Sequence, residues 1–234
     1  MLLATGLLLS SFALFARQEG SASTAASVAI DNDYVRVSKI DFDLNRPGPP
    51  GSPGPATGTA TLPTITIVVQ PSALPEWSEH LPGSGPFTYQ GLYFTERGRE
   101  VRYEYRNSGD NSAYREIRVE LKRVPPASLF AKDAVALDPA HNKVLFENDL
   151  VRVVRIHFGP GEKGPVVDKR PRVIILLTRT QAQVQKPGGK PEPRDSPAGS
   201  IQWSLGGSQA TINGPAGPLD NIVVGLKSPA GQPK

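Results

Sequence analysis

Two stretches of the chain repeat each other, and this internal repeat constrains the fold more than any other sequence feature. Residues 30–42 read IDNDYVRVSKIDF, residues 146–158 read FENDLVRVVRIHF, and the two align without gaps 116 positions apart. A second pair, IRVELK at 117–122 and IVVGLK at 222–227, aligns 105 positions apart. The first copy is therefore about 11 residues longer between these anchors. A repeat of this kind predicts two copies of one domain.

Each copy has the pattern of short β-strands. Runs rich in Val, Ile, Tyr and Thr are bounded by Gly, Pro, Asn and Asp, and the 23 Gly and 24 Pro favour turns over long helices. We expect first-copy strands at 34–42, 64–70, 90–96, 100–106 and 115–122. We expect second-copy strands at 150–158, 172–184, 200–204, 208–213 and 220–227. Strands of this length and spacing predict an all-β sandwich or barrel.

The repeat divides the chain into four expected segments. They are an N-terminal targeting segment (1–22), a first domain (28–123), a linker with a helical turn at 128–132 (124–143) and a second domain (144–228). The first domain carries two additions, a Pro-rich loop at 46–58 and an insertion at 71–86 that we expect to cover one end or edge of the domain. The second domain has a proline-elongated hairpin connection at 185–199.

The N-terminal segment predicts export. Residues 2–16, LLATGLLLSSFALFA, are apolar but too few to span a bilayer comfortably, and small residues follow them. Gly20 and Ala22 offer a small-x-small cleavage site, so we expect a signal peptide cleaved near Ala22 and a periplasmic or secreted protein. An uncleaved N-terminal anchor is the alternative, because no Lys or Arg precedes Arg17.

Composition excludes several classes of site and partner. The chain contains no Cys, which excludes disulfides, thiolate catalysis and zinc–thiolate centres. Its net charge is +4, yet the 26 Lys and Arg are scattered among 22 acidic residues. No basic helix or RNA-stacking motif accompanies them, so we expect a solvated mixed-charge surface and no nucleic-acid partner.

The second copy resembles the cupin superfamily along its length. The resemblance lies in FENDLVRVVRIHFGPGEK, PRVIILLT, GSIQWSLGGSQATIN and DNIVVGLK, and it is carried to the first copy mainly by the internal repeat. It implies two tandem cupin-like jelly-roll β-barrels in one chain, a bicupin from an internal duplication. Because cupin barrels often pair through sheet edges, it also implies a homodimer.

The same resemblance locates a metal site whose ligands are missing. Metal-binding cupins carry a His-x-His pair after a Gly-Pro turn, and those positions hold Val167 and Lys169 here. The Glu position falls near Val173, and the last His position is Gln209. In the first copy, residues 57–64 offer no ligand and the second-motif position falls near Tyr103. We therefore expect no metal and no cofactor.

Six residues are candidate ligand-binding groups: Lys169, Gln209, His157, Tyr103, Arg172 and Trp203. If Lys169 keeps the inward direction of the ligand it replaces, its ammonium needs a partner or a lowered pKa. A bound carboxylate or phosphate would be that partner, with Gln209 donating a hydrogen bond. The alternative is that Lys169 reaches the barrel mouth or pairs with Asp168 or Glu162. His157 is a candidate barrel-lining acid–base group. The alternative is an exposed or hydrogen-bonded histidine on the strand.

Three classes of function remain open. The first is a non-catalytic module that binds a small anionic or sugar-like molecule or serves a structural role. The second is a metal-independent enzyme, isomerase- or epimerase-like, in which His157, Lys169 or Tyr103 transfers protons. The third is a protein-interaction module that uses the Pro-rich loops. The sequence favours the first and names no ligand.

Overall fold

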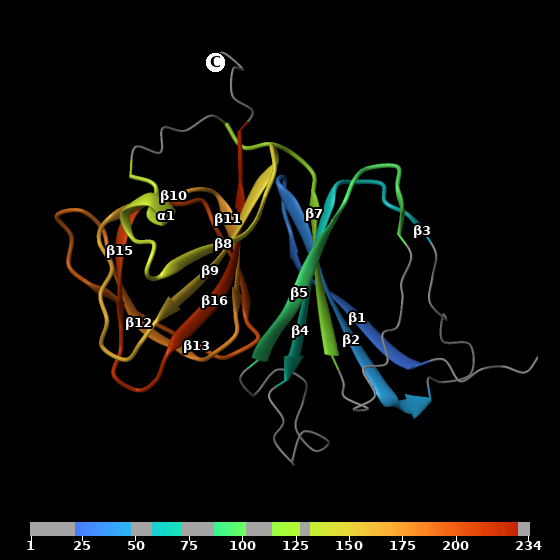
Figure 1. The fold of residues 1–234 in the computed structure, drawn as a ribbon, viewed down its shortest axis with the longest axis horizontal. Helices are drawn as coiled ribbons and strands as arrows, with labels where there is room; N and C mark the ends of the chain where they lie inside the picture. Colours follow the sequence, from blue (N-terminus) through green and yellow to red (C-terminus); the bar gives the residue numbers. More distant parts are fainter. Residues whose placement is uncertain (1–21, 48–57, 72–86, 102–113, 127–131, 229–234) are drawn as a thin grey trace, which may run out of the picture.

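The computed structural model describes residues 22–47, 58–71, 87–101, 114–126 and 132–228, and nearly all of its regular structure is β (Figure 1). The strands of the first half are β1 (Ala22–Asp31), β2 (Val35–Pro47), β3 (Gly58–Thr59), β4 (Thr64–Pro71), β5 (Phe87–Thr95), β6 (Glu100–Val101) and β7 (Tyr114–Leu121). A short helix follows, α1 (Ala134–Leu137). The strands of the second half are β8 (Asn142–Glu147), β9 (Val151–Phe158), β10 (Val167–Lys169), β11 (Arg172–Leu176), β12 (Thr180–Gln185), β13 (Glu192–Ser196), β14 (Ile201–Ser204), β15 (Gly207–Asn213) and β16 (Leu219–Leu226).

The second half of the chain is a jelly roll of two antiparallel sheets. One sheet has the order β14-β11-β16-β9-β8 and the other the order β10-β15-β12-β13. Apart from the consecutive pairs β8–β9 and β12–β13, strands that follow each other in sequence alternate between the sheets, as they do in a double Greek key. The two sheets enclose the interior of the barrel on the left of Figure 1.

The first half repeats one of these sheets strand for strand. Its five-stranded sheet has the order β5-β4-β7-β2-β1, the counterpart of β14-β11-β16-β9-β8. The short strands β3 and β6 form a separate two-stranded ladder. Because several of the residues expected to oppose the sheet lie outside those described, closure of the first half into a barrel stays a prediction.

Local hydrogen bonds repeat along with the strands. The Asn32 side chain accepts from the N–H groups of Tyr34 and Val35, each at 2.9 Å, and so holds the turn before β2. The side chain of Asn148, 116 positions later, accepts from the backbone of residues 150 and 151 at the same distances. At the ends of the sheets, the Lys122 ammonium pairs with Asp31 and the Lys227 ammonium pairs with Glu147. The sequence repeat is therefore also a repeat of structure.

The largest hydrophobic core lies between the two halves and not inside either of them. The two five-stranded sheets face each other in the centre of the molecule (Figure 1), and side chains from both form one buried cluster. Its members are almost free of solvent, with exposed fractions of 0–1% for the largest, and include Ile65, Ile67, Ile117, Val119, Val151, Val153, Val173, Ile175, Ile222 and Val224. Burial on this scale makes the contact between halves resemble the interior of one domain.

Aromatic pairs close the two ends of this core. Tyr34 stacks on Trp203 with ring centroids 5.7 Å apart, and Phe94 stacks on Phe146 at the same separation. Phe94 and Trp203 occupy equivalent positions, because they pair in register with Ile65 and Val173 on equivalent strands. Their partners are not equivalent, because Tyr34 aligns with Leu150 and Phe146 aligns with Ile30 in the repeat.

Strand alternation gives the second-half sheet two different faces. On β11, Val173 and Ile175 pack in the core between the halves, whereas Arg172, Ile174 and Leu176 line the barrel interior. Side chains two residues apart on a strand share a face, so this division follows directly from the backbone. One sheet therefore both holds the halves together and builds the wall of a cavity.

Several sequence-based expectations need correction. The stretch 172–184 is not one strand but two, β11 and β12, separated by a turn at residues 177–179. The connection 185–199 contains a strand of its own, β13. The observed helix begins at residue 134, after the expected turn at 128–132, most of which lies outside the described residues, as do most of the loop 46–58 and of the insertion 71–86.

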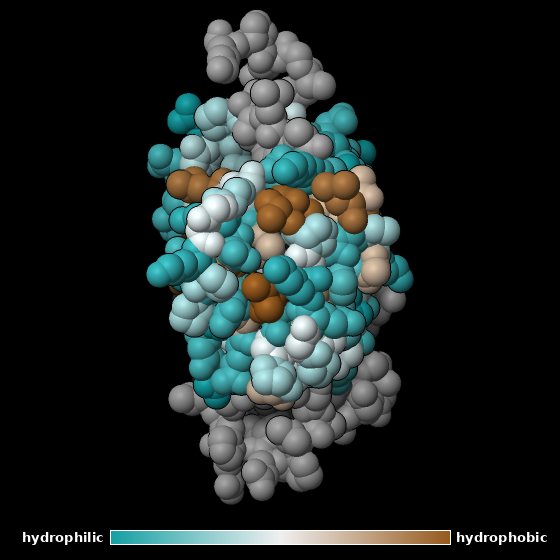
Figure 2. All heavy atoms as spheres, turned by 90° about the vertical axis from the view of Figure 1, so that its left-hand side faces the viewer, coloured by the Kyte–Doolittle hydropathy of each residue, from teal (hydrophilic) through white to brown (hydrophobic). Residues whose placement is uncertain are grey.

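Hydrophobic residues on the outer face of the second half are scattered. Figure 2 shows this face as mostly hydrophilic, with separate hydrophobic spots and no broad apolar area. Isolated apolar residues of this kind are ordinary on a protein surface. Among the described residues, no helix has the length and hydrophobicity to cross a membrane.

Candidate functional site

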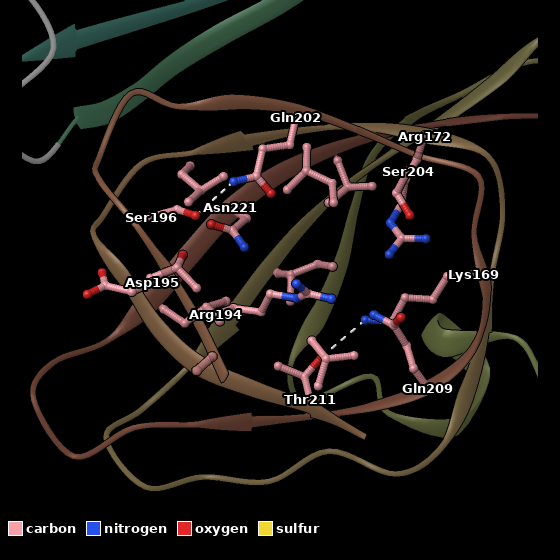
Figure 3. Close-up of a pocket in the computed structure, with 18 of the residues that line it drawn as sticks. Lys169, Arg172, Arg194, Asp195, Ser196, Gln202, Ser204, Gln209, Thr211 and Asn221 are labelled. Atoms are coloured by element: carbon pink, nitrogen blue, oxygen red, sulfur yellow. Dashed lines mark hydrogen bonds between the residues drawn. The ribbon is translucent and has the colours of Figure 1, made fainter. Parts of the chain in front are cut away.

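A cavity of about 560 Å³ occupies the interior of the second barrel (Figure 3). Its walls come from both sheets, with apolar side chains such as Ile156, Ile174 and Val223 on one side. The polar side chains around it are those of Lys169, Arg172, Thr180, Arg194, Asp195, Ser196, Gln202, Ser204, Gln209, Thr211 and Asn221. Its volume is in the usual range for a small-molecule site, and its mixed lining suits a ligand with both apolar and charged parts.

Lys169 ends β10 and extends its side chain into this cavity (Figure 3). Its ammonium donates a hydrogen bond to the Thr211 hydroxyl at 3.2 Å. Burial, followed by repulsion from the Arg172 guanidinium, lowers the pKa of Lys169 to about 7, and attraction to the Asp138 carboxylate offsets only part of this. The residue keeps intermediate solvent accessibility because its side chain faces the cavity.

A glycine fixes the backbone that carries Lys169. Gly206 has a φ of 90°, and a Cβ atom there would lie 2.0 Å from the carbonyl oxygen of Lys169. Any side chain at this position would push β10 away from the neighbouring turn, and the positive φ disfavours other residues as well. Gly206 therefore helps to position the ammonium.

Two arginines extend into the same space. Arg172, on β11, is only 5% exposed, and its guanidinium donates to the Arg170 carbonyl at 3.2 Å. Burial lowers the pKa of Arg172 to about 10. Arg194 extends toward these two cations from β13 on the opposite wall and pairs with the exposed Glu192 at 3.1 Å (Figure 3). The cavity thus gathers three cationic side chains from three strands.

Arg194 has a carboxylate partner in Glu192, but Lys169 and Arg172 have none among the described residues. Within the described part of the chain, no carboxylate lies within ion-pair distance of Lys169 or Arg172. Asp195 is the only acidic residue of the lining, and both of its oxygens accept from Arg179, at 3.0 and 2.8 Å. Buried cations without a partner are costly, so this arrangement favours the binding of an anion.

Two further polar atoms of the lining have no hydrogen-bond partner in the structure. They are the hydroxyl oxygen of Thr180 and the side-chain carbonyl oxygen of Asn221, both on buried residues. A buried polar atom without a partner costs about 1–3 kcal/mol, so a ligand that satisfies it gains affinity. Asn221 can only accept through this oxygen and therefore favours a ligand hydroxyl or N–H group.

The structure brings together three of the six residues singled out from the sequence. Lys169, Gln209 and Arg172 all line the cavity. Trp203 touches its wall, but the indole ring stacks on Tyr34 in the core between the halves. Trp203 thus belongs mainly to the interface.

The other two residues do not join the cavity. The expectation that His157 lines the barrel is wrong: its side chain is 56% exposed and lies 3.8 Å from Asp220, on the opposite face of β9 from Ile156. The one-residue offset decides this, because neighbouring side chains on a strand point to opposite faces. Tyr103 lies outside the described residues. Val173 also points away from the cavity, which its neighbours Arg172 and Ile174 line.

Sequence reasoning missed Asn221, Thr180, Thr211 and Arg194. One signal was present for Asn221: it interrupts the apolar strand LDNIVVGL two residues before Val223, so a polar side chain had to share the face of apolar neighbours. Thr180 and Arg194 had no such signal, because the strands that carry them were not separated correctly from their surroundings.

No protein-family model matches the sequence, and no curated protein matches it. Among solved structures, AerE from Microcystis aeruginosa is similar over 89% of this chain and 98% of its own, with a TM-score of 0.53 and 7% identity. A cupin 2 conserved barrel domain protein from Leptotrichia buccalis is similar over 89% of this chain and 91% of its own, with a TM-score of 0.45 and 7% identity. A cupin domain from Bordetella pertussis Tohama I covers 37% of this chain and 92% of its own, with 18% identity and a TM-score of 0.35.

These likenesses concern the fold alone. The all-β jelly-roll architecture and the resemblance to cupins, both predicted from the sequence, are confirmed. The chain is an all-β protein whose second half is a jelly-roll barrel that encloses a polar cavity.

Proposed function

We propose that the second barrel binds a small organic anion, such as a hydroxy acid or a sugar acid, and that binding is its main role. The observation that carries this proposal is the burial of Lys169 and Arg172 in one cavity without a carboxylate. Arg172 can bind a carboxylate or phosphate through two parallel N–H bonds, and Lys169 adds a point charge. The unpaired oxygen of Asn221 supports a ligand that also carries hydroxyl groups.

This binding does not require a metal. At the positions where the cupin resemblance places ligands, Val167 offers no donor atom and the Lys169 ammonium is bonded to Thr211. The adjacent Arg172 guanidinium would repel a cation. Such a set does not fit Zn, Fe or Mn, which prefer imidazole and carboxylate ligands.

The test is a thermal-shift and calorimetry series with lactate, gluconate, glucuronate and inorganic phosphate. A ligand at about 100 times its dissociation constant stabilises a protein by about 2.7 kcal/mol. We expect a shift with at least one anion that is lost in Arg172→Gln and kept in Arg36→Gln, which changes an exposed arginine of the first half. A shift with divalent metals and none with anions would contradict the proposal.

The metal-independent enzyme remains the second candidate function, now supported by Lys169 alone. Its lowered pKa and its position in the cavity are typical of catalytic amines. His157 offers it no support, because its side chain is largely exposed outside the cavity.

Export and self-association stay proposals as well. The apolar segment 2–16 and the small residues after it support a cleaved signal peptide, which mass spectrometry of the mature protein would test. The edges of the sheets support a homodimer, which light scattering would test.

A further inference from the structure

We infer that the Lys169 amine is a nucleophile that captures 2-oxo acids as an imine, while the Arg172 guanidinium holds their carboxylate. This inference rests on the proposed anion site, since it uses the same cavity, but it adds a covalent reaction and a narrower class of ligand. A 2-oxo acid carries a carboxylate and a carbonyl on adjacent carbon atoms. Its recognition therefore needs a guanidinium and an amine that face one small space.

The geometry provides a suitable amine. Lys169 extends from the end of β10 into the cavity, and its one hydrogen bond is to the Thr211 hydroxyl at 3.2 Å (Figure 3). A paired carboxylate would hold the side chain protonated and block its lone pair, and no such carboxylate lies within ion-pair distance of it in the described residues. Burial and the nearby guanidinium, which together lower its pKa to about 7, keep a large share of the amine uncharged at neutral pH. Desolvation and a neighbouring cation are the usual means of activating a lysine for imine formation.

The geometry also provides an anchor for the carboxylate. Arg172 comes from β11, the next strand in sequence, which belongs to the other sheet, and Figure 3 shows its guanidinium and the Lys169 side chain in the same space. The Arg172 guanidinium donates one hydrogen bond from Nη1 to the Arg170 carbonyl. The remaining N–H groups can hold a carboxylate in the fork geometry that orients a planar ligand. The cavity volume of about 560 Å³ leaves room for a side chain on the oxo acid.

The reaction balances without any further reagent. The uncharged amine attacks the carbonyl carbon, a C–N bond forms, and the carbonyl oxygen takes up a proton to give a carbinolamine. The carbinolamine then loses its hydroxyl group and the remaining nitrogen proton as one molecule of water, leaving a C=N bond. No atom changes its oxidation state through an external oxidant or reductant. The Thr211 hydroxyl, already bonded to the nitrogen, is positioned to accept and return a proton through water.

The test traps the imine by reduction. The full chain is incubated with pyruvate or phenylpyruvate and sodium cyanoborohydride near pH 7.5, and the product is analysed by intact mass and peptide mapping. We expect one adduct per chain, with the mass of the oxo acid less one oxygen atom, on the peptide that contains Lys169. The adduct should persist in Lys190→Arg, which changes an exposed turn lysine, and disappear in Lys169→Arg, which keeps the charge but cannot form the imine.

Two controls separate the possible failures. The melting temperature of each variant shows that it is folded, and Lys169→Met serves as a second variant without the amine. Lactate and phenyllactate match the probes but lack the carbonyl group. If these hydroxy acids bind through Arg172 and no oxo acid is trapped, imine capture is wrong and the anion site stands. If the oxo acids and hydroxy acids neither bind nor react, both proposals fail. Adducts spread over several lysines would also overturn the inference.

Discussion

The two five-stranded sheets share a strand order but differ on the face that points away from their common core. In the first sheet this face carries Glu116 and Arg118 on β7, which form an ion pair at 2.6 Å. The equivalent positions on β16, 105 residues later, are Asn221 and Val223, which line the cavity. The Glu116–Arg118 pair thus neutralises charge on the first sheet, whereas the second sheet faces Lys169 and Arg172, which have no ion-pair partner among the described residues.

The comparison shows how two sheets with the same strand order can share one role, forming the core between the halves, while the second sheet also lines the barrel cavity. Both copies keep the residues that face the other half, such as Ile117 and Ile222, because each provides half of one core. The opposite face differs more, since an ion pair there corresponds to cavity-lining residues. Four predictions test this division, beginning with the one that should change stability most.

Truncation of either equivalent core residue should destabilise the whole molecule. Ile117→Ala and Ile222→Ala each remove a side chain that is 0–1% exposed, so we expect each to lower the free energy of unfolding by about 2–5 kcal/mol. Because the core is shared, urea denaturation followed by tryptophan fluorescence and by circular dichroism should show one coincident transition. Two separate transitions, with only one shifted, would show that the halves fold independently.

Lys169 should give the second half a pH dependence of stability. In the folded state its pKa is about 7, against 10.5 for an ordinary lysine, so between these values the unfolded chain binds the extra proton. The free energy of unfolding should therefore rise with pH across this window, by up to about 1.4 kcal/mol per pH unit. Below the window the amine is charged in both states, so Lys169 destabilises the fold by a constant amount and adds no pH dependence.

The measurement is the free energy of unfolding of wild type minus that of Lys169→Met, taken at a series of pH values. Subtraction removes groups that titrate in both proteins, including Tyr89, whose pKa is raised by burial. The Arg172 guanidinium lowers the pKa of Lys169 and the Asp138 carboxylate raises it. Because Arg172→Gln removes the repulsion, we expect the rise in stability to begin at a higher pH in this variant. A flat difference between pH 7 and 10 would contradict the assigned environment.

Breaking the Glu116–Arg118 ion pair of the first sheet should lower the free energy of unfolding by less than the core truncations do. Glu116→Gln leaves Arg118 without this carboxylate on a mostly buried face, and we expect a loss of about 1–3 kcal/mol in the free energy of unfolding. The double change Glu116→Gln with Arg118→Met should recover part of the loss, because it removes the charge as well. A double variant less stable than the single one would argue that Arg118 has a different main partner.

The smallest effects should be equal in the two halves. Asn32→Ala and Asn148→Ala each remove a side chain that accepts two backbone N–H groups at a matching turn, and each should cost about 0.5–1.5 kcal/mol. Thermal denaturation of the two variants side by side measures the difference. Unequal losses would show that the local repeat does not extend to the energetics of these turns.

Much of the fold could be predicted from the sequence because the repeat preserved its strands. The alignment of residues 30–42 with 146–158 leads directly to the equivalence of β2 and β9. The cupin resemblance, which aligns Val167 and Lys169 with a His-x-His pair, also led to the expectation that Lys169 points into the barrel, where the structure places it. Both predictions depend on patterns within short stretches of consecutive residues, where the alternation of side chains along a strand is visible in the sequence.

What could not be predicted depends on facts that are not local. The face of a strand changes with a one-residue shift, so the sequence left two alternatives for His157, and the structure shows the exposed one. The sequence also does not show which apolar residues face the barrel interior and which face the core between the halves. Val173 and Ile174 are both apolar, yet Val173 packs in that core and Ile174 lines the cavity. Only the arrangement of the two sheets decides which of them meets a ligand.

The alternation along β11 and β16 has a consequence for how the protein can change over generations. Residues such as Ile174 and Val223 contact the cavity, while their immediate neighbours Ile175 and Ile222 hold the halves together. Substitutions on the first set can alter which molecule is accepted while the second set preserves the architecture. The barrel can therefore acquire a new specificity by mutations at every other position of the same strands, without first acquiring a new source of stability.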